Sequence, residues 1–180
     1  MTQEQAISLF LDALQPLQMH GFHLSLHGQT LAEGYWKPFS SHQPHRLFSV
    51  SKSVVSLAIG LLVTDGKVRL DDRICSFFPE WVSSNTSPLL LSTTIRDMLT
   101  MRTPFRSTTY RPLLDDNWAR TWFSAEPHHI PGTVFNYDTS ASQVLCALVE
   151  KLTGMPILSF MENRLFSKIG MNGHKQRIQD

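Results

Sequence analysis

Apolar residues recur with helical spacing near the start of the chain. The first such segment follows Thr2–Gln5, which has the form of a capping box. Its apolar positions are Ile7, Phe10, Leu11 and Leu14. This spacing predicts an amphipathic helix, and Pro16 should end it because proline has no N–H to donate to the preceding turn.

The next stretch changes from a helical period to strict alternation. Apolar and polar residues alternate over 22–26, and residues 31–36 are predicted to return as a second strand. Between them, His27–Thr30 contains a glycine and predicts a turn. The pattern therefore predicts a β-hairpin, which by itself is marginally stable and needs further strands or a helix to cover it.

The most apolar segment of the chain is predicted to be a helix from about Ser49 to Asp65. Gly66 follows it, at the position where a helix often ends in the left-handed conformation. One face carries Val50, Val54, Leu57 and Leu61, and most of the remaining positions are apolar too. A helix that is apolar nearly all round is typical of a buried central helix.

Four further helices and one tight turn are predicted from the same signals. Residues 68–78 indicate a short extended piece and a helical turn closed by Pro79. The predicted helices are 94–101, opened by a capping box at Thr94–Asp97; 113–123; 140–152, capped by Ser140 and ended by Gly154; and 156–166, beginning at Pro156. With about six helices and two strands, the sequence predicts the α+β fold class.

Composition and charge narrow the possible partners. The chain has 180 residues, is 42% hydrophobic and 17% charged, and carries a net charge of +1, so it is a globular domain or a large piece of one. That balance does not indicate nucleic acid or an anionic membrane surface as a partner. The longest uncharged apolar run, Val54–Val63, is too short to span a bilayer. No secretory signal is visible at the N-terminus, so a cytoplasmic location is expected.

Cysteine and histidine do not form a metal-binding pattern. Cys75 and Cys146 lack CxxC spacing, which predicts two free thiols and neither a disulfide framework nor a zinc site. His23 and His27 share a strand face, and His128 and His129 are adjacent in a loop. Without a third ligand at metal spacing, these histidines are predicted to be surface residues.

The densest candidate for chemistry is Ser49 with Lys52. Residues three apart share one face of a helix, so both side chains should meet in its first turn. A serine hydroxyl becomes a nucleophile when a neighbouring base takes its proton, and an unprotonated lysine amine can be that base. The alternative is a serine that caps the helix beside a surface lysine.

Tyr137 is the third candidate. It lies in a loop that leads directly into the predicted helix at Ser140. A tyrosine there can pass a proton between a serine and a lysine, or hydrogen-bond a leaving group. The alternative is a core tyrosine whose hydroxyl is satisfied by a neighbour.

Six landmarks in order resemble the serine beta-lactamase-like family, which comprises class C beta-lactamases, D-alanyl-D-alanine carboxypeptidases and related esterases. The resemblance covers about Gly21 to Met171. The matching segments are Ser49–Lys52 (the serine–lysine motif), Gly66–Asp72, Phe78–Glu80, Thr94–Thr100, Tyr137–Thr139 (the Tyr-x-Asn motif), and Gly154 with Phe166–Met171.

The resemblance implies roles for four residues. Ser49 would be the nucleophile of an acyl-enzyme, Lys52 the acceptor of its proton, and Tyr137 the relay to the leaving group. Thr139 stands where the family has a substrate-binding asparagine. The substrate would be a small-molecule amide or ester, and no metal or organic cofactor is required.

Two departures from the family are local. Thr139 replaces the asparagine, and Met101–Pro104 replaces the frequent His-Thr-Ser-Gly. Thr139 counts mildly against a true beta-lactamase.

A third departure concerns length. We expect residues 1–171 to be a truncated beta-lactamase-like domain, consisting of its helical part and first two strands, and 172–180 to be a disordered polar tail. The family's third motif, on a strand that helps to form the oxyanion hole, would lie beyond residue 180. Whether this chain is an enzyme by itself is therefore open. The alternative is a non-catalytic relative that serves as a binding or assembly piece, or an inactive fragment, with self-association expected through the open sheet edge.

Overall fold

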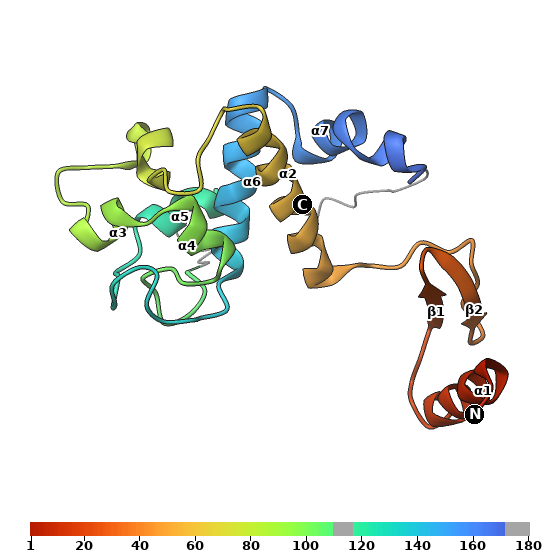
Figure 1. The fold of residues 1–180 in the computed structure, drawn as a ribbon. Helices are drawn as coiled ribbons and strands as arrows, with labels where there is room; N and C mark the ends of the chain where they lie inside the picture. The colour runs from red at the N-terminus through yellow and green to blue at the C-terminus, as the bar shows by residue number, and fades with distance from the viewer. Residues whose placement is uncertain (110–116, 172–180) are drawn as a thin grey trace. The chain divides into compact units, whose positions relative to one another are not determined.

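The computed structural model describes residues 1–109 and 117–171 (Figure 1). It divides into two compact units, Met1–Arg46 and a larger unit that begins at Leu47. Within the described residues there are seven α-helices and one two-stranded antiparallel sheet. The predicted α+β class is therefore confirmed.

The N-terminal unit consists of one helix and the hairpin. Helix α1 (Gln3–Leu14) begins with the predicted capping box, in which Thr2 and Gln5 each accept from the other's backbone N–H. Strands β1 (Gly21–Leu26) and β2 (Gln29–Tyr35) pair antiparallel, with an irregularity after Leu24. Two residues of the turn between the strands have positive φ. The second of them is Gly28, for which this conformation carries no steric cost.

The apolar layer of this unit is thin. Phe22 of β1 makes edge contacts with the rings of Phe10 and Trp36, each at 6.0 Å between centroids. No residue of 1–46 is fully buried. Within this unit the hairpin therefore rests on a few aromatic contacts and has no closed core.

The larger unit is built around the helix pair α2 (Ser51–Thr64) and α6 (Thr139–Thr153), which pack against each other (Figure 1). Helix α7 (Ile157–Arg164) contacts both, while α4 (Ile95–Leu99) and α5 (Trp118–Phe123) pack on α6. The remaining short elements are α3 (Pro88–Ser92) and 3₁₀ turns at Phe48–Val50, Ile74–Phe77, Pro79–Trp81 and Phe166–Ile169. The largest fully buried side chains include Ile59, Leu62, Trp122, Leu145, Leu148 and Met161.

Among the described residues only one face of α2 is buried, so the predicted buried central helix is buried on one side and exposed on the other. The buried side chains are Val55, Ala58, Ile59 and Leu62. On the predicted apolar face, Val50 is 61% exposed and Leu57 is 53% exposed. The reason is that α6 and α7 supply the neighbours of α2 within this unit, and they cover one side of it.

Two helix starts differ from the prediction because an earlier or later residue provides the cap. Helix α5 begins at Trp118, since the side chain of Asn117 accepts from Arg120 N; positions 113–116 of the predicted helix lie outside the described residues. Helix α6 is capped by Asp138, which accepts from Ser140 N, while Ser140 itself is buried inside the first turn. The helix ends as predicted, at Gly154 in the left-handed conformation.

The C-terminal part closes with two short helical pieces. Helix α7 ends at Arg164, two residues before the predicted end, and a separate 3₁₀ turn follows at Phe166–Ile169. The predicted tail 172–180 lies outside the described residues. Among the described helices none is long and apolar enough by itself to cross a membrane; α6 and α7 reach that length and hydropathy only as a pair, bent by 67°.

Candidate active site

Ser49 and Lys52 meet at the start of α2, as the spacing predicts. Ser49 lies in a 3₁₀ turn (Phe48–Val50) that continues directly into the helix. Lys52 Nζ donates to Ser49 Oγ at 3.1 Å. Ser49 is exposed and Lys52 is half-buried, so the pair is open to solvent within the described unit.

The backbone immediately before Ser49 is strained. Phe48 has φ 45°, a left-handed conformation that is unfavourable for a bulky residue. Its carbonyl accepts from the Ser51 hydroxyl, and the residue is 77% exposed. Such strain costs about 1–3 kcal/mol and is concentrated at functional sites in proteins. The sequence did not indicate this feature, since a left-handed phenylalanine has no local signature.

Tyr137 completes the group from a distant part of the chain. Lys52 Nζ lies over its ring, 5.1 Å from the centroid. Hydrogen bonds with Ser49 and Lys52, together with the charge of Lys52, hold the pKa of the Tyr137 phenol below its usual value near 10. The side chain is 51% exposed, so it is not the core tyrosine of the alternative interpretation.

The loop that carries Tyr137 is held by the segment after α4. Asn136 N donates to Met101 O at 2.8 Å, and Gly132 N donates to Arg102 O at 2.8 Å. Met101 adopts φ 55°, which turns the chain out of α4 and toward this loop. The position of Tyr137 therefore depends on residues 101–102, more than thirty positions earlier in the sequence.

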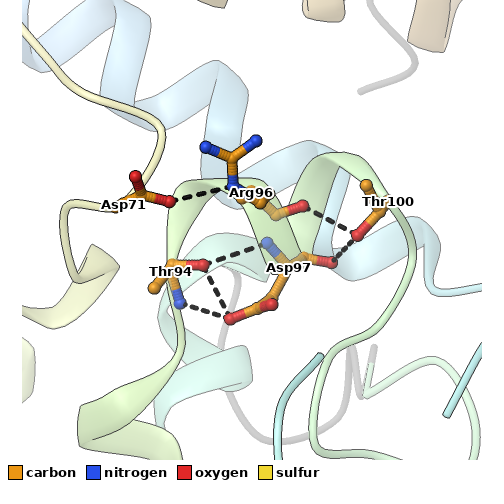
Figure 2. A network of polar contacts seen from close by, with 5 residues as sticks. All are labelled: Asp71, Thr94, Arg96, Asp97 and Thr100. Atoms are coloured by element: carbon orange, nitrogen blue, oxygen red, sulfur yellow. Dashed lines mark hydrogen bonds and ion pairs between the residues drawn. The ribbon is translucent and has the colours of Figure 1, made fainter. Parts of the chain in front are cut away.

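Helix α4 is in turn fixed by a polar network (Figure 2). Thr94 and Asp97 form the predicted capping box: Asp97 Oδ2 accepts from Thr94 N at 2.9 Å and from the Thr94 hydroxyl at 2.7 Å. Arg96 donates to Asp71 at 2.9 Å, and the guanidinium of Arg96 lowers the pKa of the Asp71 carboxyl. These contacts hold the N-terminal end of this short helix, and at its C-terminal end the Thr100 hydroxyl donates to Arg96 O at 2.8 Å.

Gly132 is required where the Tyr137 loop approaches α4. It has φ 81°, and a Cβ at this position would lie 2.9 Å from Asp97 Oδ1. Only glycine combines this conformation with this close approach. The contact joins the capping box of α4 directly to the loop that carries Tyr137.

Thr139 and Asp138 lie at the junction of this loop with α6. Thr139, the predicted substrate-binding residue, is the first residue of α6 and is partly buried; the structure does not place it in contact with the Ser49–Lys52 pair. Asp138, which the sequence analysis did not single out, has no exposed surface and caps the helix. Its signal was present, since aspartate before an apolar helical pattern is a preferred cap.

The described residues contain no group of three or more His, Cys, Asp or Glu side chains that could hold a metal ion. Both thiols are free, as predicted. Burial raises the pKa of Cys75 and of Cys146 to about 11, so neither is a reactive thiolate at neutral pH.

Comparisons with known proteins agree on the fold. D-amino acid amidase from Ochrobactrum anthropi SV3 matches with a TM-score of 0.73 and 23% identity, over 97% of this chain and 53% of that one. The octameric penicillin-binding protein homologue from Pyrococcus abyssi matches with a TM-score of 0.68 and 19% identity, over 96% and 44%. D-stereospecific amidohydrolase from Streptomyces sp. matches with a TM-score of 0.56 and 21% identity, over 70% and 42%. The chain thus spans about half the length of these solved structures.

A comparison with curated protein sequences finds no relative. A model of the Beta-lactamase family, however, matches residues 20–174, which include the hairpin, the Ser49–Lys52 pair and the Tyr137 loop. This range is most of the chain and agrees with the resemblance seen from Gly21 to Met171. The chain therefore belongs to the beta-lactamase family.

Proposed function

We propose that this chain carries the nucleophile and proton-transfer groups of a serine hydrolase that forms an acyl-enzyme on Ser49. The observation that carries the proposal is the contact between Lys52 Nζ and Ser49 Oγ at 3.1 Å, with the Tyr137 ring beside the same amine. A hydroxyl within hydrogen-bond reach of an amine base is the arrangement that activates a weak nucleophile.

In the proposed reaction, Lys52 and Tyr137 carry the proton of the Ser49 hydroxyl to the leaving group. Ser49 Oγ bonds to the acyl carbon while its proton passes to the unprotonated amine of Lys52. The proton then reaches the leaving nitrogen or oxygen through Tyr137, and the bond between the acyl carbon and the leaving group breaks. Water subsequently releases the acyl group and restores the Ser49 hydroxyl. The lowered pKa of Tyr137 supports this relay, because it moves the phenol toward the pH at which it can exchange protons.

An amide is the substrate class that the comparisons favour over an ester. Two of the similar structures are described as an amidase and an amidohydrolase that act with D stereochemistry. Thr139, the first residue of α6, stands where the family has a substrate-binding asparagine, and its hydroxyl is the group proposed to hydrogen-bond an acyl substituent. Which amide this chain accepts is a matter for a substrate panel that includes D- and L-configured amides.

Covalent labelling tests the proposal. A fluorophosphonate should add to the 180-residue chain at Ser49, and mass spectrometry of the digested protein should place the adduct on that residue. Ser49→Ala should abolish the adduct. Ser53→Ala is the matched control, because Ser53 is exposed on the same helix and should leave labelling unchanged. Labelling that persists in Ser49→Ala would remove Ser49 as the nucleophile.

A second candidate function is a non-catalytic binding or assembly piece. The observation that favours it is the exposed apolar surface of α2 and of the turn before it, where Leu57 and Val50 are each more than half exposed. A chain of this kind would bind another polypeptide through that face and would not react with the fluorophosphonate. The labelling experiment therefore separates the two candidates.

A further inference from the structure

A fully buried carboxylate lies directly after Tyr137 in the chain. Asp138 is 0% exposed, whereas aspartate is among the residues that are almost never fully buried without partners. Removing such a group from water is costly unless hydrogen bonds replace its hydration. Its surroundings should therefore contain a dedicated set of donors.

Four donors surround the carboxylate, two at each oxygen. Oδ2 accepts from the Thr103 hydroxyl at 3.0 Å and from Trp122 Nε1 at 3.3 Å. Oδ1 accepts from Ser140 N at 3.0 Å and from the Thr108 hydroxyl at 3.3 Å. All four partners are uncharged, and they come from the 101–109 segment, from α5 and from the first turn of α6.

The same carboxylate therefore joins three pieces of the chain at the base of the Tyr137 loop. The backbone of Asp138 adds a contact to Met101 Sδ at 3.3 Å, and Asn136 on the other side of Tyr137 donates to Met101 O. Tyr137 is thus held between two anchored neighbours. Its own phenol extends outward to Lys52 and Ser49.

We propose that Asp138 is a positioning residue, whose buried carboxylate fixes the backbone from which the Tyr137 phenol reaches Lys52 and Ser49. The inference rests on the proposed function, since positioning Tyr137 matters for turnover only if Tyr137 takes part in the reaction. Asp138 itself does not touch the substrate. A displacement of about 1 Å at a reacting group can lower the rate by about 10²-fold, so a residue of this kind is visible in kinetics.

Asp138→Asn is the sharpest variant because it preserves shape and changes one oxygen into an NH₂ donor. Whichever oxygen is replaced, the new NH₂ faces one N–H that cannot turn round: Trp122 Nε1 on one side or Ser140 N on the other. The hydroxyls of Thr103 and Thr108 can rotate to accept, but the N–H groups cannot. The amide is therefore expected to shift the loop without emptying the site.

The measurement is the pKa of the Tyr137 phenol, read by NMR from tyrosine labelled with ¹³C at the ring carbon that carries the hydroxyl. Tyr137→Phe assigns the resonance. In the unsubstituted chain the pKa should lie below 10, and in Asp138→Asn it should rise toward about 10 as the contacts with Ser49 and Lys52 are lost. Asp65→Asn, which removes a carboxylate paired with Arg164 at another part of the fold, is the control and should leave the Tyr137 pKa unchanged.

An unchanged Tyr137 pKa in folded Asp138→Asn overturns the proposal. Should Asp138→Asn melt below the temperature of the measurement, Thr103→Val removes one donor at 3.0 Å without altering charge, and the same criterion applies to it. The titration reads geometry and needs no substrate. If the pKa moves while Ser49 is not labelled, the positioning role stands and the proposed function fails. If Ser49 is labelled and the pKa stays, only the positioning role fails.

Discussion

Ser49, Lys52 and Tyr137 are brought together by two different kinds of contact. Ser49 and Lys52 lie one turn apart on the same helix, so their 3.1 Å contact follows from local geometry. Tyr137 arrives on a separate loop and contacts the same amine at its ring. The pair is therefore a property of one helical turn, whereas the group of three is a property of the folded unit.

Lys52→Arg should remove nearly all reaction at Ser49, although the positive charge is kept. A guanidinium does not give up its proton in proteins, so it cannot accept the proton of the Ser49 hydroxyl. Loss of a general base of this kind lowers rates by about 10²–10⁴-fold. The measurement is the rate of fluorophosphonate labelling at neutral pH.

Lys67→Arg is the matched control for this experiment. Lys67 lies just after α2 and donates to Leu152 O at 3.0 Å, away from Ser49 along the chain. The Lys67→Arg chain should react with the fluorophosphonate at the same rate as the unsubstituted chain. A Lys52→Arg chain that labels within about tenfold of that rate would make Lys52 a structural residue rather than a base.

At the scale of elements, α2 is anchored at its C-terminal end to α7. Arg164 donates to both oxygens of Asp65, through Nη1 at 2.5 Å and Nη2 at 2.8 Å. The hydrogen bonds with the Arg164 guanidinium lower the pKa of the Asp65 carboxyl. Gly66 then leaves the helix in the left-handed conformation that the sequence predicts. This ion pair fixes the C-terminal end of α2, whereas the candidate site lies at its N-terminal end.

Asp65→Asn should lower the melting temperature at neutral pH, by less as the solution becomes acidic. The folded-state pKa of Asp65 lies below the value near 3.9 of an unfolded chain, so the pair stabilises the folded state above that pH. As the pH falls through about 4 and below, protonation removes the contribution. Melting curves of both chains from neutral pH to about 3 should therefore converge.

A double-mutant cycle with Arg164→Met isolates this contact. Arg164→Met should lower the free energy of unfolding less in the Asp65→Asn chain than in the unsubstituted chain, because the two residues share the interaction. Additive losses, or a difference between the chains that does not depend on pH, would show that Asp65 acts through something other than the pair with Arg164.

At the scale of the whole molecule, the larger unit exposes a considerable number of apolar side chains. Phe48, Val50, Leu57 and Phe135 are each more than half exposed. Large exposed apolar patches in soluble proteins mark interaction surfaces or cause association. The chain spans about half the length of the solved structures it resembles. We therefore expect these exposed apolar side chains to promote association of the isolated polypeptide.

The isolated 180-residue chain should therefore self-associate as its concentration rises, and Leu57→Glu should reduce that association. Leu57 is 53% exposed on α2 and carries no role in the candidate site. Ser56→Glu is the matched control, since it adds the same charge at an exposed neighbour without removing apolar surface. Light scattering over a series of concentrations makes the measurement. A chain that stays monomeric throughout, or two variants that behave alike, would contradict an association driven by Leu57.

The features that the sequence alone determined are local. The capping boxes at Thr2 and Thr94 and the left-handed glycines 66 and 154 all appear where the pattern predicts them. So does the contact between Ser49 and Lys52. Each depends on residues within about one turn of one another, where backbone geometry leaves few arrangements.

The features that only the tertiary structure decided depend on which distant segments pack together. The pattern of α2 is apolar on most sides, and only the positions of α6 and α7 determine that Ile59 is buried while Leu57 is exposed. Asp138 could be recognised as a cap, but its burial among Thr103, Thr108 and Trp122 requires the loop and α5 to close over it. Without the family resemblance, spacing could not place Tyr137 beside Lys52 either. A residue's local pattern limits its backbone conformation, whereas its burial and partners depend on long-range packing that no short window of sequence contains.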